Sequence, residues 1–598
     1  MAYAQPINPY EKILISIVFA FLISFMMASF TNAFNSSSCI PTDSGPVVKT
    51  TPLVSFLQSV QQTALKTFGN KDFDPKVYVD MSLKHSLSTT SEAFSRLSRN
   101  ENGSVSVSDL NGFMEEYLDG AGEDLVCAEP VDFVAEPEEF LPKVKNPQMR
   151  AWALEVHSLS KNLSRKVSDR VLEKPELHSL LPLPNPVIIP GSRFREVYYW
   201  DSYWIIRGLL ASKMYDTAKG IVTNLISLIN EFGYVLNGAR AYYTNRSQPP
   251  LLSSMIFDIH NQTRDVEFVK ISLPALLKEY QFWNSGNHKV IIQDAEGEVH
   301  NLSRYYAMWN TPRPESSSID QETASKLSNI CEKTQLYREL ASAAESGWDF
   351  SSRWMRNASD PTTFSTTCVV PVDLNAFILK MELDIAFLAN VTGDSSIAAR
   401  FTEASRARQK AMNSIFWNAE KGQWFDYWLT ETNTSKDAYI WEAANQNQKS
   451  FASNFFPLWI TLFHSDVTMM EKVIQSFQTS GLLRPSGIAT SLTNTGQQWD
   501  FPNGWAPLQH LIVEGLAMYG SEEANSLAKD IAIRWIRTNY VAYQKTGAMH
   551  EKYDVEKCGE YGDGGEYKPQ TGFGWSNGVV LAFLEEFGWS EDLKVGCQ

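Results

Sequence analysis

Residues 373–391 read DLNAFILKMELDIAFLANV and show the pattern that decides the fold class. Their apolar side chains recur every three or four residues, the spacing that places them on one face of an α-helix. Asp373 stands where an N-cap is expected, and Gly393 lies just past the last apolar turn, where a left-handed C-cap is common. We therefore predict a helix whose apolar set is Leu374, Phe377, Ile378, Met381, Ile385 and Leu388.

The same helical spacing recurs along most of the chain. Thr51 and Pro52 begin one such helix as N-cap and first-turn proline, and its apolar residues continue to Gly69. Strand patterns are rare, and residues 290–299 predict one small hairpin. Helices without alternating strands exclude βαβ architectures, and no fixed repeat favours a solenoid, so an all-α bundle or α/α barrel remains. Further helices are predicted over 201–213, 215–232, 396–416, 465–480, 505–519, 521–540 and 573–587.

Composition narrows the class of protein. Of 598 residues, 43% are hydrophobic and 20% charged, as in a globular protein that folds in water. The formal net charge of −16, without any run of Lys or Arg, argues against a nucleic-acid partner. The cysteines lack metal-ligand spacing, so we expect no zinc, and their pairing stays open. They are Cys39, Cys127, Cys331, Cys368, Cys558 and Cys597.

The amino terminus predicts contact with a membrane. Ile13–Phe30 is an almost unbroken apolar run, and the nearest basic residue, Lys12, precedes it and would stay in the cytoplasm. We interpret residues 1–12 as a cytoplasmic tail, 13–33 as a signal anchor, 34–50 as a Ser/Thr-rich stalk and 51–598 as the catalytic domain. The expected location is the plasma membrane, with the domain outside the cytoplasm. The alternative is a secreted protein, cleaved after Ala33.

Nine N-x-S/T triplets agree weakly with a translocated domain, since such triplets also arise by chance. We exclude Asn245 as an acceptor because its neighbour Arg246 is assigned below to a pocket. The nine are Asn35, Asn102, Asn162, Asn245, Asn261, Asn301, Asn357, Asn390 and Asn433.

Four segments combine carboxylates, arginines and aromatic rings too densely for ordinary surface loops: 190–204, 345–353, 497–507, and 550–554 continued by 564–567. Hydrolysis of a glycosidic bond needs one carboxyl group as acid and a second that activates water or attacks the sugar. Aromatic rings stack on sugars, and glycine allows close backbone approach. By spacing alone, each acid is equally well an ion-pair partner or a helix cap.

Two of these segments resemble the signatures of the trehalase family of glycoside hydrolases. Residues 190–203 read PGSRFREVYYWDSY and are similar to the first signature, and residues 498–507 read QWDFPNGWAP and are similar to the second. The amino-terminal apolar run is most similar to the plant members. The resemblance spans roughly residues 50–590 and also takes in 313–316, 346–354, 551–554 and 572–578.

The resemblance implies an (α/α)6 barrel with small β-hairpin excursions that hydrolyses the small molecule α,α-trehalose to two glucoses. It further implies inversion at one anomeric carbon, no cofactor and no metal, and we expect a monomer. By motif match Asp349 is the general acid and Glu551 the general base, with carboxyl groups about 6.5–9.5 Å apart. The implied substrate-binding residues are Arg193, Phe194, Tyr198, Trp200, Asp201, Asn237, Arg246, Gln248, Arg313, Glu315, Gly347, Trp499 and Glu566.

The 558–567 segment, the choice of base and the role of two arginines each allow more than one interpretation. Residues 558–567 contain four glycines and predict a lid that closes over the sugar, or else a plain flexible loop. Extra acids in that segment make Glu560 or Glu566 an alternative base, and Arg193 or Arg246 could serve as a structural ion-pair partner. Ser192 stands where the family usually has glycine.

Three other functions compete with trehalose hydrolysis. A related barrel glycosidase acting on α-glucosyl oligosaccharides would have a longer, open cleft. A catalytically inactive sugar sensor would have lost one of the two carboxylates, and both are present. A hydrolase of trehalose phosphate is disfavoured by the acids Asp201, Glu315 and Glu566 near the arginines.

Overall fold

The computed structural model describes residues 45–430 and 438–597, and most of them are helical. The predicted cytoplasmic tail, the signal anchor and the stalk as far as residue 44 lie outside the described residues, as do Cys39, Asn35 and Asn433. Within the described ranges, no helix combines the length and apolar character needed to cross a membrane.

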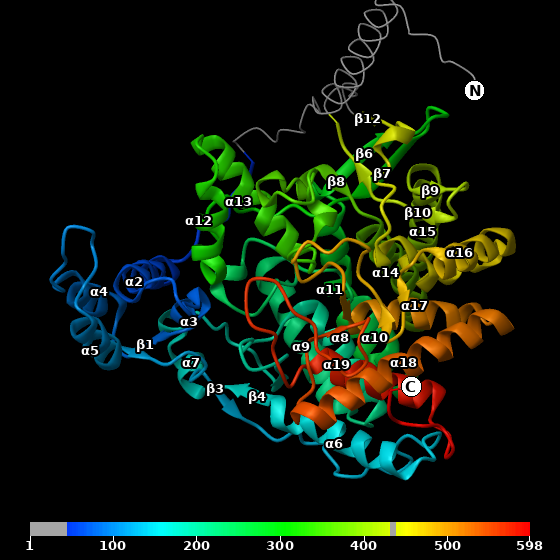
Figure 1. Cartoon of the computed structure of the whole chain (residues 1–598), viewed down its shortest axis with the longest axis horizontal. Helices are drawn as coiled ribbons and strands as arrows, with labels where there is room; N and C mark the ends of the chain where they lie inside the picture. The colour runs from blue at the N-terminus through cyan, green and yellow to red at the C-terminus, as the bar shows by residue number, and fades with distance from the viewer. Residues whose placement is uncertain (1–44, 431–437, 598) are drawn as a thin grey trace, which may run out of the picture.

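Six segments of the described chain pack side by side in a closed ring at the centre of the molecule (Figure 1). Side chains of these segments are buried on almost every side, which is typical of a helix with neighbours all round. In ring order they are α8 (Tyr199–Ala211), α10 (Leu252–Thr263), α14 (Val372–Thr392), the 3-10 segment η10 (Ala452–Trp459), α17 (Ala506–Tyr519) and α19 (Gly574–Phe587), which returns to α8.

A second layer of helices covers the ring from outside. Each packs on one or two ring segments, and several expose their opposite face, so their sequences carry the amphipathic pattern that predicts helices. This layer consists of α6 (Pro147–Leu163) on α19, α9 (Tyr215–Phe232) on α8 and α10, α11 (Val266–Trp283) on α10 and α14, α15 (Ser395–Ile415) on α14, α16 (Val467–Thr479) on η10, and α18 (Glu522–Thr546) on α17 and α19.

The ring closes at a contact between two glycines. A Cβ atom on Gly208 of α8 would lie 2.6 Å from the Cα of Gly578 in α19, and one on Gly578 would lie 1.9 Å from the carbonyl oxygen of Trp204. Any side chain at either position would therefore push α8 and α19 apart. Glycine at both positions lets the first and last ring segments meet backbone to backbone.

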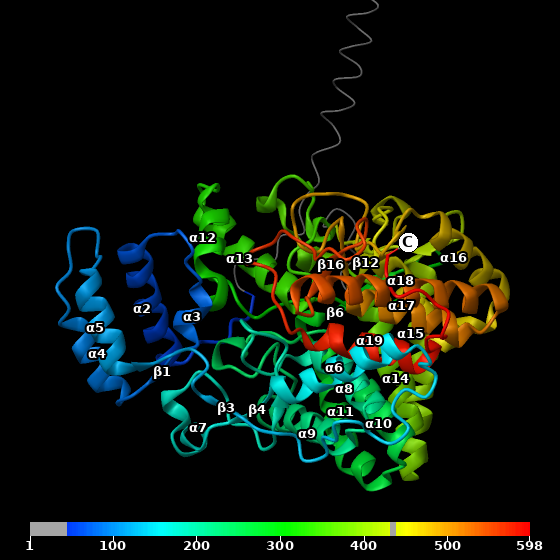
Figure 2. The same cartoon turned by 60° about the horizontal axis from the view of Figure 1, so that its bottom comes forward.

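A smaller helical lobe lies beside the ring (Figures 1 and 2). Its first helix, α2, has Thr51 as the predicted N-cap, whose hydroxyl accepts from the Val54 amide at 3.2 Å. Gln61 joins the lobe to the rest of the protein by donating to the Pro314 carbonyl, in the loop before α12 (Ser317–Ser325), at 2.7 Å. Residues 45–50, assigned above to a stalk, also contact the body through a 2.9 Å bond from Val48 to Met308. The lobe comprises α2 (Pro52–Phe68), α3 (Pro75–Val79), α4 (Leu87–Ser95) and α5 (Val107–Tyr117).

Strands are short and serve as local clasps. The predicted hairpin is β6 (Lys289–Gln293) with β7 (Val299–Ser303), joined by β12 (Tyr439–Ile440). β15 (Asn503–Trp505) pairs with β16 (Lys552–Asp554), which sets the second signature beside the segment of Glu551. The other elements are α7 (Asp169–Glu173), α12 (Ser317–Ser325), α13 (Ile330–Glu345), β1 (Ser82–Leu83), β2 (Leu118–Asp119), β3 (Leu125–Cys127), β4 (Ser164–Val167), β5 (Val187–Ile188), β8 (Val369–Val370), β9 (Trp417–Asn418), β10 (Gln423–Trp424), β11 (Tyr427–Trp428), β13 (Leu483–Arg484) and β14 (Gly487–Ile488).

All nine predicted helices are present, with ends that differ by a few residues, but the predicted cap of α14 is wrong. Pro371 occupies the N-cap position, and Asp373 lies inside the first turn. The carboxylate of Asp373 instead binds the buried guanidinium of Arg353 at 2.6 and 3.0 Å. Leaving the buried guanidinium without a carboxylate would cost more than a helix cap contributes, so Asp373 pairs with Arg353. At the other end, Gly393 adopts the predicted left-handed conformation with φ of 84°.

Candidate active site

A cavity of about 80 Å³ lies where α8, α17 and α19 begin. The four segments singled out from the sequence all contribute to its wall. Of the predicted site residues, Glu551 alone does not border it. Those that line the cavity are Arg193, Phe194, Tyr198, Trp200, Asp201, Asn237, Arg246, Gln248, Arg313, Glu315, Gly347, Asp349, Trp499 and Glu566.

Eight further lining residues were not singled out as site residues. Most lie inside segments quoted above, so their neighbourhood in sequence was the available signal, whereas Tyr243 and Ala344 lay outside every such segment. The eight are Tyr243, Ser316, Ala344, Gln498, Trp505, Tyr567, Phe573 and Trp575.

Asp349 is held by a tight turn that follows α13. Gly347 in that turn has φ of 74°, and a Cβ there would lie 2.6 Å from the ring of Trp200. The Trp348 amide donates to the hydroxyl of Ser346 at 3.0 Å. The Asp349 carbonyl accepts a 2.6 Å bond from the side-chain amide of Gln498. The turn before Asp349 and the bond from Gln498 to its carbonyl therefore both fix the backbone of Asp349.

The surroundings of Asp349 favour its protonated form. Burial raises the pKa of this carboxyl group to about 7, against the lowering effect of the Arg313 charge, and the carboxylate of Glu566 raises the pKa further. At neutral pH a large share of Asp349 therefore carries a proton, as a general acid requires.

Glu551 lies in a different electrostatic setting. It is fully buried, and neither of its carboxylate oxygens has a hydrogen-bond partner among the described residues. Burial raises the pKa of Glu551, while the ammonium of Lys552, 3.4 Å from Oε1, lowers it. Its backbone is held by Gln570, whose carbonyl accepts from the Glu551 amide at 3.1 Å, and by the indole of Trp575 at 2.9 Å.

The charges of Asp349 and Glu551 both affect the pKa of two residues in the cavity wall. Burial raises the pKa of Asp201 well above its ordinary value, and the charges of Asp349 and Glu551 raise it further. The pKa of Tyr567 is likewise raised by burial first and then by Glu551 and Asp349. Because Trp575 borders the cavity and its indole donates to the Glu551 carbonyl at 2.9 Å, Glu551 lies close behind the cavity lining.

Two arginines bring positive charge to the cavity. Arg246 binds Glu315 at 2.5 Å, and Arg313 donates to Glu566 at 2.8 Å. The buried Nε of Arg246 and Oε2 of Glu315 have no hydrogen-bond partner in the described part of the chain. Unpaired buried polar atoms are costly, so a ligand rich in hydroxyl groups would relieve that cost by pairing with them.

Arg193 is both an ion-pair partner and part of the wall. Its guanidinium binds both carboxylate oxygens of Asp74, at 2.9 and 2.8 Å, and lies over the ring of Tyr567. Asp74 is the N-cap of α3, so the small helical lobe reaches the site through this pair. The structural ion pair considered for Arg193 is therefore present, without removing Arg193 from the cavity.

Aromatic rings make one side of the cavity rigid. The rings of Trp499 and Trp505 stack with centroids 4.0 Å apart, and Trp200 and Trp575 meet them at tilted or right angles. Two further rings of the lining, Tyr198 and Tyr243, share a 2.8 Å hydrogen bond between their hydroxyls. Such fixed flat surfaces suit the C–H faces of a sugar ring.

Only the end of residues 558–567, the segment predicted to be a lid, borders the cavity. Glu566 and Tyr567 reach the cavity, and residues 563–570 also line a groove of about 940 Å³ on the other side. A pocket for a small organic ligand measures roughly 300 Å³ or more, which exceeds the 80 Å³ cavity. Displacement of this segment would join cavity and groove, but movement of a lid stays a prediction.

The two alternative bases are engaged elsewhere. Glu560 is exposed, pairs with Lys545 at 2.7 Å and does not border the cavity. Glu566 is held by Arg313 and by the hydroxyl of Ser316 at 3.1 Å. Both oxygens of Glu566 are therefore bound, whereas those of Glu551 have no hydrogen-bond partner in the described chain.

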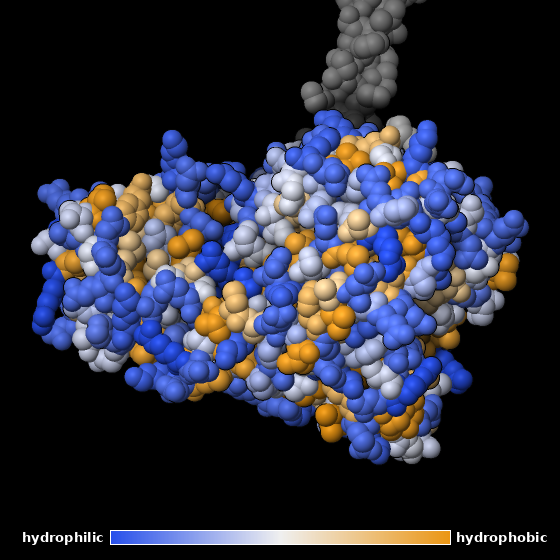
Figure 3. Space-filling view, turned by 90° about the horizontal axis from the view of Figure 1, so that it is seen from below, coloured by the Kyte–Doolittle hydropathy of each residue, from blue (hydrophilic) through white to orange (hydrophobic). Residues whose placement is uncertain are grey.

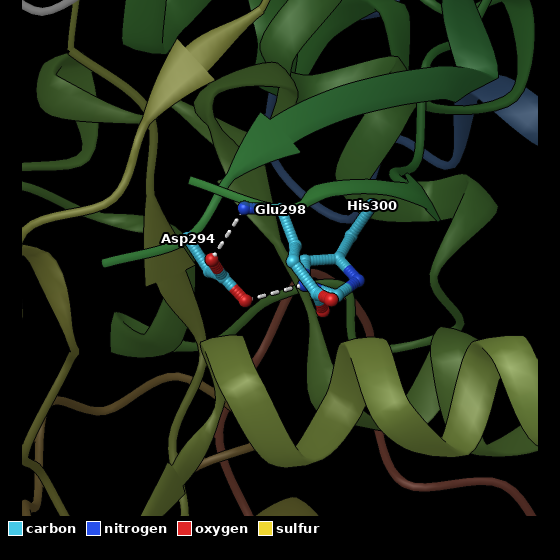
Figure 4. A group of neighbouring side chains, drawn as sticks. All are labelled: Asp294, Glu298 and His300. Atoms are coloured by element: carbon cyan, nitrogen blue, oxygen red, sulfur yellow. Dashed lines mark hydrogen bonds and ion pairs between the residues drawn. The ribbon is translucent and has the colours of Figure 1, made fainter. Parts of the chain in front are cut away.

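One group of acids and histidine in the described chain lies close enough together to hold a metal ion. Figure 4 shows Asp294, Glu298 and His300 in the hairpin of β6 and β7. Asp294 accepts from the Glu298 amide at 2.9 Å and pairs with the His300 ring at 2.7 Å, while Glu298 binds Lys410 at 2.5 Å. These contacts explain the cluster as one that stabilises the turn between β6 and β7. None of its residues borders the cavity.

Comparison with known proteins gives consistent matches. The family model described as Trehalase matches residues 70–588. "Trehalase" of Arabidopsis thaliana is 59% identical over 557 residues, covering 92% of this chain and 89% of the relative. "Trehalase" of Homo sapiens is 40% identical over 519 residues, covering 86% of each. Among solved structures, "Neutral trehalase Nth1 from Saccharomyces cerevisiae" matches with a TM-score of 0.52 at 27% identity, covering 67% of this chain and 73% of that one.

Proposed function

Because this chain belongs to the trehalase family and hydrolyses trehalose to glucose, we propose that Asp349 and Glu551 are the acid and base of that reaction. The supporting observation is the contrast between two carboxyl groups at one cavity. Asp349 has a pKa raised to about 7, whereas Glu551 accepts no hydrogen bond in the described chain and its Oε1 lies 3.4 Å from the ammonium of Lys552.

The proposed reaction moves one proton at each carboxyl group. Asp349 donates its proton to the glycosidic oxygen, so that the first glucose leaves as a neutral alcohol. Glu551, ionised, takes a proton from a water molecule that attacks the anomeric carbon from the opposite face. Inversion at that carbon gives one β-glucose and one α-glucose, and it requires the two carboxyl groups to stand about 6.5–9.5 Å apart.

The charged groups of the cavity wall would hold the substrate. Trehalose is neutral and carries hydroxyl groups on both rings, so it needs many directed donors and acceptors. Arg246 and Arg313 offer planar forks of donors, and Glu315 and Glu566 offer acceptors. Their mutual ion pairs keep each side chain in place before the sugar arrives.

The test is trehalose hydrolysis followed by NMR at the anomeric protons. Wild type should release α- and β-glucose in equal early amounts. Asp349→Asn and Glu551→Gln should each lose about 10²–10⁴-fold in kcat. Glu560→Gln, which changes an exposed acid of the 558–567 loop, should keep full activity.

A second substrate separates the two roles. α-Glucosyl fluoride has a leaving group that needs no proton, so Asp349→Asn should hydrolyse it nearly as well as wild type does. Glu551→Gln should fail on both substrates, because water still needs a base. Equal impairment of both variants on the fluoride would contradict the assignment.

We also infer that the ring and its cover form an (α/α)6 barrel and that the enzyme acts as a monomer. Each of the six ring segments has an outer helix packed on it, which supports the barrel. Apolar residues on the face in Figure 3 lie in small groups among polar ones, which gives little for a second copy to cover. Light scattering after gel filtration tests the monomer.

The catalytic part, we further propose, lies outside the cytoplasm, anchored by residues 13–33 or released by cleavage after Ala33. A disulfide between Cys558 and Cys597 supports an oxidising compartment. Of the triplet asparagines, Asn245 is buried, as its exclusion requires, whereas several others are exposed: Asn102, Asn162, Asn301, Asn357 and Asn390. The mass of the mature amino terminus, and sensitivity of the whole protein to an N-glycanase, test this proposal.

A further inference from the structure

Lys552 is a fully buried lysine that the reaction described above does not use. Its ammonium donates to the side-chain oxygen of Gln498 at 2.8 Å and to the carbonyl of Gly564 at 3.0 Å. A lysine has three such donors, and Oε1 of Glu551 also lies within ion-pair distance, at 3.4 Å. Because a buried cation is costly without partners, the position of Lys552 is determined by these three groups.

Each partner of Lys552 belongs to a different part of the site. Gln498 also donates to the carbonyl of Asp349 at 2.6 Å, so Lys552 is one side chain away from the acid. Gly564 belongs to the 558–567 loop, and Glu551 is the proposed base. The pairing of Trp505 with Lys552 between β15 and β16 fixes the backbone from which the lysine extends.

The loop is seated where it meets Lys552. The amide of Gly565 donates to the carbonyl of Gly496 at 3.2 Å, and a Cβ on Gly564 would lie 2.5 Å from that same carbonyl oxygen. The amide nitrogen of the Asn503 side chain donates to the carbonyl of Asp563 at 2.8 Å. If the loop left this seat, the ammonium of Lys552 would lose one of its two hydrogen-bond acceptors.

We propose that Lys552 is a positioning residue that couples the seating of the 558–567 loop to the charge of Glu551. This inference rests on the proposed role of Glu551 as base. A buried carboxylate with no hydrogen bond favours its neutral form, and a cation a few ångströms away restores the charged form. With the loop in place, Lys552 is held against Glu551, so the base is charged when the site is enclosed.

Other groups around Glu551 do not replace this cation. Arg193 acts on the pKa of Glu551 less than Lys552 does, and it is bound to Asp74. Burial lowers the pKa of the preceding His550, which disfavours a positive charge there. The charged or titratable groups that face Glu551 are Lys552, Arg193, Asp201, Asp349, His550 and Tyr567.

The test is the pH dependence of kcat/KM on trehalose for Lys552→Met, Lys552→Gln and Lys552→Arg. The base must be ionised, so activity rises with pH through the pKa of Glu551. Loss of the cation raises that pKa, and the acidic limb of the two neutral variants should move about one to three units to higher pH. The Arg variant should keep the limb near that of wild type. A lysine with a merely structural role would lower kcat/KM equally at every pH.

Lys545→Met is the matched control. Lys545 is exposed and binds Glu560 at 2.7 Å, so it contacts the same loop without touching Glu551. The acidic limb of the kcat/KM profile of Lys545→Met should stay at the wild-type pH. Hydrogen exchange at amides 558–567 should rise more in Lys552→Met than in Lys545→Met. The Gln variant keeps donors for Gln498 and Gly564, so it supplies a folded neutral variant if the Met variant has a low thermal midpoint.

The outcomes separate this inference from the assignment of the base. If Glu551→Gln retains hydrolysis, the base assignment fails and the inference fails with it. If Glu551→Gln is inactive but both neutral variants keep the wild-type acidic limb, the inference alone is overturned. A shifted limb with unchanged exchange in the loop would likewise overturn the coupling.

Discussion

Gly347→Ala should damage both stability and catalysis, because two separate costs meet at that residue. The positive φ of 74° is unfavourable for a residue with a Cβ, by about 1–2 kcal/mol. The new methyl would lie 2.6, 2.7 and 3.0 Å from three ring atoms of Trp200, well inside contact distance. That indole is packed against Trp204, Trp499 and Trp575 and has little room to retreat.

Overpacking of this kind costs about 1–3 kcal/mol, so the total loss for Gly347→Ala should be about 2–5 kcal/mol. Asp349 lies two residues further on, and a shift of about 1 Å can cost 10²-fold in rate. Urea unfolding followed by tryptophan fluorescence, with kcat on trehalose, measures both effects. Gly393→Ala is the control, since Gly393 has φ of 84° but no atom near its Cβ position. Equal stability of the two variants, with full activity of Gly347→Ala, would refute this reasoning.

Three further predictions concern pH, the small lobe and the disulfide. Asp349 must be protonated to act, and burial raises its pKa to about 7; kcat/KM should therefore fall as pH rises through about 7, and a pH–rate profile that stays flat to pH 9 would contradict this. Asp74→Asn removes the charged partner of Arg193 and should lower kcat/KM by about tenfold, through KM, whereas unchanged steady-state constants would show that Arg193 holds its place unaided. Cys558→Ser removes the disulfide to Cys597 and should lower the free energy of unfolding by about 2–4 kcal/mol. The thermal midpoint should fall, as it should when a reductant is added to wild type; identical midpoints would contradict this prediction.

Local pattern was enough to predict much of the helical structure. Helix 215–232 has one apolar face and ends at Gly233 in the left-handed conformation, and the observed α9 has the same bounds. Several helices were missed, including α6, whose buried residues do follow helical spacing. α11 carries Pro274 in its interior, and α13 has few large apolar residues in its first turns, so neither stands out in sequence. Tertiary packing, rather than periodicity, stabilises both.

The site was predictable where its residues cluster in sequence. Asp349 and Trp499 lie in segments whose composition is unusual, and the structure brings them to one cavity. Asp74 had no such signal, because its importance depends on the partner Arg193, far along the chain. Asp373 shows the same limit, since its cap-like position in sequence gives no hint of Arg353. Pairings of buried charges arise only when distant segments meet.

The glycine contact between α8 and α19 also bears on how the protein is made. Synthesis runs from the amino terminus, so α8 emerges well before α19, the ring segment with which it makes its glycine contact. Until then the apolar face that α19 covers is open to solvent, a state prone to aggregation and suited to chaperone binding. Contacts between such distant segments also form slowly. Trp575 lies on α19, so the nascent chain has no complete cavity until that helix has been made.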